Sequence, residues 1–412
     1  MFRDTVLRAI SAMCLTSPLA LFPAKAFGQD RPVEVPETMV ETLDPAGVRA
    51  GSFVLYPRIT ADTRYDTNIY NQADGRSDTI IVARPSVRLS SDFPRHSLDL
   101  TAAAEARRYA DTKEENSNQW SLQAHTRLDL ADRFFLATTM GAARRIERRG
   151  TFGDQFFTDE PVSYNEFAAG AQFGRSGGII DWRVNAATRK LSYNDAALGG
   201  VAIDESSRNV RRDSAGLRIG YHSSPDLGFY VQINGNQLRY RVNSIRDSQG
   251  LSLLGGVSYQ VTDLVNIEAA VGYVMQDSDD PAERGIKAFD FNLHAAWTPA
   301  SRAKFELVAQ RSVERSPFED TSSVLRTTIT GDASVAIGSR MLVGLEIGVV
   351  QNDYRGSDRR DTRYSAEVIA RYLITPKLAG FVGLGARKQS GSGLGSRSYD
   401  GASVRAGISF VL

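Results

Sequence analysis

The side chains best suited to acid–base or metal chemistry in this chain are its four histidines. His96 and His222 border short, turn-like segments, whereas His125 and His294 lie on the polar faces of alternating segments. No two histidines have the spacing of metal ligands, and the only cysteine, Cys14, lies in an apolar N-terminal stretch. A hydrolase would need a nucleophile beside a histidine base, and the sequence marks none. We therefore expect neither an enzyme nor a metal centre.

Two further segments have compositions that bind ligands in other proteins. The segment SGSGLGS at 390–396 is rich in glycine, but it lacks G-x-G-x-x-G spacing and no helical pattern follows it, which argues against a phosphate-binding loop. The segment DSDDPAER at 277–284 carries enough carboxylates for weak Ca²⁺ binding, although a solvated acidic loop is the simpler interpretation. We therefore expect no cofactor.

Most of the charged side chains occur instead at alternate positions of long segments. In QWSLQAHTRLDL, Trp120, Leu122 and Leu128 share one face, and His125 and Arg127 share the other. The segments FDFNLHAAW and NIEAAVGYVM repeat this pattern. A period of two is that of a β-strand, whereas an amphipathic helix repeats every 3.6 residues. The charged rows are therefore predicted to lie on one face of a β-sheet.

The spacers between these segments indicate how the sheet is organised. After Ala50, short spacers rich in turn formers alternate with longer polar spacers along the whole chain. The strands, about 10–12 residues long, can cross a membrane when tilted. A closed sheet leaves no hydrogen-bonding edge in lipid. The sequence therefore predicts an all-β fold, a transmembrane antiparallel up-and-down β-barrel of about 18 strands, within a range of about 16–18.

The polar faces of the strands are predicted to line the lumen of this barrel. A barrel of this size is too wide for wall side chains to fill it. For any single residue, bracing of the wall by opposite charges on neighbouring strands is the favoured interpretation; for the whole set, a polar pore is favoured. The residues predicted to line the lumen are Arg58, Asp62, Arg64, Arg84, Arg88, Glu105, Arg107, Arg127, Asp129, Arg145, Glu166, Asp181, Arg183, Arg218, Glu268, Asp290, Glu306, Glu346, Glu367, Arg371 and Arg405.

The N-terminus has the order of a secretory signal peptide. Basic residues precede an apolar stretch, and AKA at 24–26 fits the small-x-small cleavage rule. We expect a signal peptide at 1–26, a flexible periplasmic lead-in at 27–50 and the barrel at 51–412. The mature chain would have no cysteine, and the formal net charge of +1 does not favour nucleic acid as a partner. The expected location is the outer membrane of a Gram-negative bacterium.

The chain ends in GASVRAGISFVL, where Ile408, Phe410 and Leu412 continue the apolar face and Arg405 lies on the other. This segment is predicted to close the barrel against the first strand, around FVLYPRITADTRY. Terminal strands of such barrels are recognised by the barrel-assembly machinery, usually through an aromatic final residue. Here Phe410 stands two places early. We expect Phe410 and Leu412 to form the assembly signal, with outer-membrane lipid and the assembly machinery as partners.

Residues 63–111 carry a moderately specific motif. A Tyr-Asp-x-Asn-Ile-Tyr stretch begins at Tyr65, Ser77-Asp78 follows, a P-x-x-x-L-x-S-D strand begins at Pro85, and RRYAD ends at Asp111. This segment resembles the opening of the outer-membrane β-barrel porin type 2 family. The rest of the chain after about residue 45 is similar to that family in pattern alone.

The resemblance implies a passive barrel rather than an enzyme, and it carries over no functional residue. Some relatives accompany exopolysaccharide synthesis and export systems, which implies polymer passage through the barrel and periplasmic polysaccharide-export proteins as partners. A small-solute porin would suit the same lumen. The Tyr65–Tyr70 stretch is expected to shape the first external turn.

Two functions remain open at this point. The leading one is a passive outer-membrane channel with a wide, polar lumen of mixed charge, for exopolysaccharide export or small solutes. The other is a structural or adhesive barrel that acts through its external loops. The longest loops are expected near 148–161 and 194–208. Phe152, Phe156 and Phe157 in the first of these fold either inward as a constriction or outward as a contact site.

Overall fold

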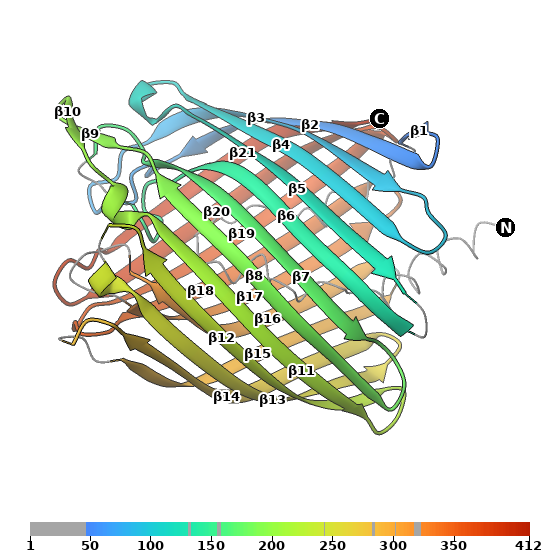
Figure 1. Cartoon of the computed structure of the whole chain (residues 1–412). Coiled ribbons are helices and arrows are strands. Elements are labelled where there is room, and N and C mark those ends of the chain that lie inside the picture. The colour runs from blue at the N-terminus through green and yellow to red at the C-terminus, as the bar shows by residue number, and fades with distance from the viewer. Residues whose placement is uncertain are drawn as a thin grey trace.

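The computed structural model describes residues 47–130, 133–154, 158–242, 244–281, 285–300, 302–316 and 323–412. These residues form a closed antiparallel β-barrel with eighteen long wall strands (Figure 1). The wall strands are β2 (Phe53–Asp66), β3 (Asp78–Ser91), β4 (Ser97–Tyr109), β5 (Ser117–Asp129), β6 (Phe134–Ile146), β7 (Ser163–Arg175), β8 (Ile180–Tyr193), β11 (Val210–His222), β12 (Leu227–Tyr240), β13 (Ser248–Thr262), β14 (Val265–Ser278), β15 (Ile286–Ala300), β16 (Ala303–Arg315), β17 (Ser323–Ile337), β18 (Met341–Tyr354), β19 (Arg360–Thr375), β20 (Leu378–Ser392) and β21 (Tyr399–Val411).

The barrel is closed by its first and last wall strands. β2 pairs antiparallel with β21, and the register places Arg64 opposite Arg405 and Ile59 opposite Phe410. Every other wall strand pairs with the wall strands before and after it in the chain. The prediction of an all-β, up-and-down barrel of about eighteen strands is therefore confirmed.

The described structure begins slightly before the wall. The short strand β1 (Val48–Ala50) forms a hairpin with the start of β2, with Val48 opposite Leu55. The predicted signal peptide at 1–26, and the expected lead-in as far as residue 46, lie outside the described residues. Among the residues that the structure does describe, no helix is long and apolar enough to span a membrane.

The two ends of the barrel differ. Eight short turns, the first at 92–96, join strands at the end that carries β1 and the C-terminus, which we call the turn end (Figure 1). Nine mostly longer connections lie at the opposite end, the loop end. These include η2 (Lys113–Glu115), η4 (Ser206–Arg208), η5 (Ser244–Arg246) and a small hairpin of β9 (Ala196–Leu198) with β10 (Val201–Ile203).

The outer and inner faces of the wall follow from the period of two along each strand. Large apolar side chains such as Leu122, Phe289 and Ile408 are exposed on the outer face. Polar neighbours such as Asp62 and Asp290 are buried on the inner face. This arrangement is the reverse of a soluble protein, because lipid is the solvent of the outer face.

Apolar packing inside the barrel is divided among small clusters at both ends, such as Phe135 with Ala137 at the turn end. The largest contains Tyr164, Tyr193 and Tyr240 together with Leu191, and the Tyr164 and Tyr193 rings stack with centroids 5.1 Å apart. A second cluster joins β14, β15 and β17. Most of the wall is therefore held by the strand ladders rather than by one central apolar core.

Candidate functional site

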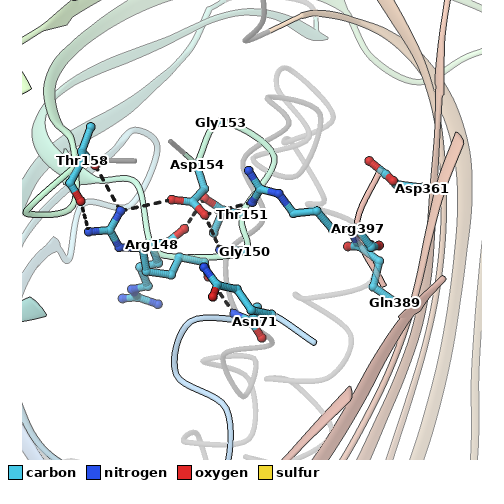
Figure 2. Close-up of polar contacts among 12 residues, drawn as sticks. Asn71, Arg148, Gly150, Thr151, Gly153, Asp154, Thr158, Asp361, Gln389 and Arg397 are labelled. Atoms are coloured by element: carbon cyan, nitrogen blue, oxygen red, sulfur yellow. Dashed lines mark hydrogen bonds and ion pairs between the residues drawn. The ribbon is translucent and has the colours of Figure 1, made fainter. Parts of the chain in front are cut away.

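The loop that follows β6 folds into the barrel interior. Its described part, residues 147–154, is called the inward loop. The Phe152 ring stacks on the Tyr354 ring of β18, with centroids 6.1 Å apart, and the Arg326 guanidinium of β17 lies 4.5 Å from the Phe152 ring centre. In the ring of eighteen wall strands, β18 lies eight strands from β6 and nine strands from β7, on the far side of the barrel. The inward loop therefore crosses the lumen to the opposite wall (Figure 2).

This position decides one of the alternatives left open by the sequence. Phe152 faces the interior as part of a constriction, while Phe156 and Phe157 lie outside the described residues. The contact between the loop and the wall is extended by Arg363 of β19, which donates a hydrogen bond to the Gly150 carbonyl.

The base of the inward loop is anchored by a buried ion-pair cluster. Arg208 of η4 donates to both Glu147 carboxylate oxygens, at 2.7 and 2.8 Å, and to Glu205 at 3.1 Å. The Tyr193 hydroxyl also donates to Glu147, at 3.1 Å. Burial lowers the pKa of Arg208, but the adjacent Glu147 carboxylate outweighs this effect and raises the pKa above its ordinary value. Arg208 therefore stays charged and ties the inward loop to the next long loop.

The turn of the inward loop is held by arginine and backbone contacts. Arg149 donates to Glu115 of η2 at 2.9 Å and to the Thr158 carbonyl at 2.9 Å. Burial raises the pKa of Glu115, against the lowering effect of Arg149. Gly150 has a φ of +74°, and a Cβ there would lie 2.4 Å from the side chain of Asn71. Glycine is therefore required at this position by both conformation and space.

Asp154 closes the inward loop against the wall. It accepts a hydrogen bond from the Gly150 N–H at 2.8 Å and pairs with Arg397 at 3.3 Å. Burial raises the pKa of the Asp154 carboxyl to about 7, although the Gly150 N–H and the two arginines Arg149 and Arg397 lower it. A recess of about 350 Å³, open to solvent, lies between the loop and Asp361, Gln389 and Arg397 of the facing wall and loop (Figure 2).

The first connection at the loop end, between β2 and β3, contacts the inward loop. Asn68 donates its backbone N–H to Asp66 at 2.9 Å and its side-chain amide to the Asp400 carbonyl at 2.7 Å. Asn71 donates to the Arg149 carbonyl at 2.7 Å, and Arg387 bridges Asp66 and the Asn68 carbonyl. The motif noted in the sequence is thus placed in a turn that touches both β20 and the inward loop.

The residues predicted to line the lumen all lie in wall strands, on the face opposite the exposed apolar side chains. All are buried or half-buried except Arg88, which is exposed near the turn end. Several are brought together as ion pairs: Arg84 bridges Asp62 and Glu105, Arg107 and Arg148 also bind Glu105, Arg145 lies near Glu166, Arg218 binds Glu268, Arg127 binds Asp129, and Arg405 binds Glu367. Arg58 lies on the inner face of β2, directly opposite Val411 of β21.

The interior also contains functional candidates that the sequence did not single out. These are the side chains that hold the inward loop, namely Arg148, Arg149, Asp154, Arg208, Arg326, Arg363 and Arg397. Several lie in segments that looked like solvated spacers. The one available signal was the run RRG at 148–150, in which two arginines precede a glycine in one of the longest loops.

The histidines are dispersed over the wall. His125 lies 3.2 Å from the Thr139 hydroxyl, His294 3.0 Å from Glu306, and His222 3.3 Å from Asp181. His96 accepts a hydrogen bond from the Asp129 N–H. Within the described residues, no group of three or more His, Cys, Asp or Glu side chains could hold a metal ion.

The fold and this interior together define a class of protein. A closed barrel with an apolar outer face, a polar inner face and a loop folded across its lumen is a membrane β-barrel of the porin type. The chain matches the family described as "Putative beta-barrel porin 2" over residues 41–411. The protein belongs to this family, which confirms the resemblance noted in the sequence, and it is a porin-like outer-membrane β-barrel.

Three solved structures with similar strand arrangements are distant from this chain in sequence. The siderophore receptor PirA from Acinetobacter baumannii is 7% identical with a TM-score of 0.47, covering 86% of this chain and 80% of that chain. OccAB3 from Acinetobacter baumannii is 11% identical with a TM-score of 0.42, covering 87% and 99%. The outer membrane protein opdK from Pseudomonas aeruginosa is 11% identical with a TM-score of 0.46, covering 87% and 98%. No curated protein matches the chain in sequence.

Proposed function

We propose that the protein is a passive channel that lets polar solutes cross the outer membrane, with secreted polysaccharide as the cargo. The observation that carries this proposal is the inward loop, because a loop folded across the lumen has a purpose in a conduit whose width must be limited. The proposal assigns no catalytic residue and no cofactor. Short turns face the periplasm in barrels of this type and longer loops face outside, so the inward loop would narrow the external half.

Neutral polar side chains on the inner wall support a sugar-containing cargo. Strands β12 to β16 present a run of amide and hydroxyl side chains on the inner face, which includes Gln232, Asn234, Ser252, Asn292 and Gln310. Of these, Asn292 is exposed and the others are half-buried. Amides and hydroxyls both donate and accept hydrogen bonds, as sugar hydroxyls do. Periplasmic polysaccharide-export proteins at the turn end are part of this proposal.

Planar-bilayer conductance tests the channel. The purified full-length protein is expected to conduct, and Phe152→Ala, which removes the stack on Tyr354, is expected to increase single-channel conductance. Phe167→Ala is the matched control, since Phe167 is an exposed aromatic on the outer face of β7. A barrel that does not conduct in the wild-type form or as Phe152→Ala would refute the channel.

A strain lacking the protein tests the cargo. Loss of secreted polymer, restored by the wild-type chain, supports export, and restoration by Phe152→Ala would show that the stack is dispensable for passage. Unchanged polymer secretion together with slower uptake of small sugars would replace export by diffusion of small solutes.

One observation favours the second function, adhesion through the loops. The β9–β10 hairpin projects from the loop end (Figure 1), and its tip exposes Leu198 and Val201. An adhesive barrel is expected to lose surface attachment when both are changed to serine, with conductance unchanged. If attachment is unaffected by this double change, the adhesive function has no support.

A further inference from the structure

Four carboxylates lie in one unbroken row across the inner wall. Glu306 of β16 is directly opposite Asp332 of β17, Asp332 is opposite Glu346 of β18, and Glu346 is opposite Glu367 of β19. We call these four residues the carboxylate row. Three steps between strands make the row about 14 Å long. Because the strands are tilted, the row also climbs obliquely along the barrel axis.

The carboxylate row does not follow the charge pairing that stabilises neighbouring strands of a β-sheet. Like charges directly opposite each other on neighbouring strands are destabilising, and opposite charges are stabilising. Elsewhere on the inner wall opposite charges are paired, as where Arg84 contacts both Asp62 and Glu105. Departures from a local rule concentrate at functional sites. Within the row, Glu306 lies beside Lys304 and the His294 ring, and Glu367 pairs with Arg405.

The opposite wall provides an independent observation of the other sign. On the inner face of β8 and β11, Arg183 is directly opposite Arg218, and Arg189 is directly opposite Arg212. β8 and β18 are eight strands apart in a ring of eighteen. Arg183 is the fourth residue of β8 from the turn end, and Glu346 is the sixth residue of β18 from the same end. The two like-charged groups therefore face each other at a similar depth.

The inner faces of two groups of wall strands differ in charge in the same sense. Strands β14 to β19, which hold the whole carboxylate row, carry eight carboxylates and four Lys or Arg side chains, Lys304, Arg326, Arg363 and Arg371; the carboxylates are Glu268, Asp290, Glu306, Glu314, Asp332, Glu346, Asp361 and Glu367. Strands β5 to β11 carry six arginines and three carboxylates; the arginines are Arg127, Arg145, Arg183, Arg189, Arg212 and Arg218. Ion pairs such as Arg218 with Glu268 join some of these charges but leave the two walls unlike.

We infer that the carboxylate row forms the cation path of the channel, opposite an arginine wall that attracts anions. This inference rests on the proposed channel function and adds its selectivity. A solute with both signs of charge would be oriented across the lumen as it passes, since each wall attracts one end. Charged groups on the walls of a water-filled lumen act on ions within about one Debye length.

Reversal potentials in a KCl gradient test the inference. A unit charge about 8 Å from a monovalent ion, in water with about 0.1 M salt, changes its local concentration about 1.5-fold, so each charge removed should change the K⁺/Cl⁻ permeability ratio about twofold. The double variant Asp332→Asn with Glu346→Gln is expected to lower this ratio about fourfold. Arg183→Gln is expected to raise it about twofold.

The matched control is Asp353→Asn, which removes the same charge from β18 but on its outer face, where Asp353 pairs with Arg360. This variant should leave the ratio unchanged. Thermal unfolding distinguishes a role in selectivity from a role in stabilising the wall. If the carboxylate row serves selectivity, removing two of its like charges should leave the unfolding temperature of the double variant the same as, or higher than, that of the wild type. A lower unfolding temperature with an unchanged ratio would make the row structural. If the variants conduct with an unchanged K⁺/Cl⁻ permeability ratio, this inference is wrong but the channel function stands. If the wild type does not conduct, both the inference and the proposed channel function are wrong.

Discussion

Asp154 should make the inward loop sensitive to pH in one direction. Burial raises its pKa to about 7, whereas the same carboxyl has an ordinary value of 3.8 when the loop leaves the wall and the group enters water. Between these values the inward state binds more protons than the released state. The contribution of Asp154 to the stability of the inward state is therefore fully present below about pH 4 and falls as the pH rises to about 7. Above about pH 7 the carboxylate is ionised in both states and the loss is complete.

The size of this effect follows from the difference between the two pKa values. About three units correspond to about 4 kcal/mol. This is an upper value, since a carboxylate ionised beside Arg397 and Arg149 can admit water. Half of it, about 2 kcal/mol, would still change the fraction of released loop about 30-fold. Arg208, whose pKa is raised, stays charged over this range, and its pair with Glu147 keeps the base of the loop attached.

Conductance recorded from pH 5 to pH 8 measures this release. The wild type is expected to spend more time in a high-conductance state as the pH rises, and Asp154→Asn, which remains neutral, is expected to show a flat profile. Asp159→Asn is the control, because Asp159 is an exposed carboxylate just beyond the inward loop whose pKa is lowered by the Gly200 and Gly199 N–H groups. A wild-type conductance that falls with pH, or an unchanged profile in Asp154→Asn, would refute the reasoning.

Three further changes test separate parts of the structure. Arg208→Ala leaves Glu147 buried and uncompensated, which should destabilise the anchor by about 3–5 kcal/mol and increase cleavage of the loop in limited proteolysis; Glu147→Gln should do less. Gly150→Ala meets a positive φ and the Asn71 side chain, so its thermal unfolding temperature should fall and its conductance rise. Phe410→Ala, or deletion of 410–412, should reduce heat-modifiable folded protein in the outer membrane, and normal insertion of both would remove the proposed role of the terminus.

The barrel could be predicted from the sequence because the pattern that builds it is local. Each strand carries its own period of two, and the lipid outside makes that period visible as large apolar residues such as Trp120 and Phe289. Closure also follows from local pattern, since the last strand keeps the alternation to Leu412. The boundaries were less accurate. The segment TPAS at 298–301 looks like a turn, but β15 continues to Ala300 through a register shift after Trp297, where a proline is tolerated.

The inward loop could not be predicted in the same way because its contacts join distant parts of the chain. Arg363 and Gly150 are separated by 213 positions, and Arg397 and Asp154 by 243. No periodicity connects such residues, and a loop rich in charge reads as solvated when its partners are unknown. The sequence therefore allowed Phe152 to face either way. The barrel closure that places β18 opposite β6 decides between the two directions.

The inward loop and the carboxylate row lie at different depths in the barrel. The inward loop is attached near the loop-end termini of β18 and β19, at Tyr354 and Arg363. The carboxylate row begins at Glu306, four residues from the turn end of β16, and reaches only the ninth residue from the turn end of β19 at Glu367. A solute that enters from the turn end therefore meets the charged walls before the narrowing. In the proposed channel, sorting by charge would thus precede sorting by size for a solute that moves from the turn end to the loop end.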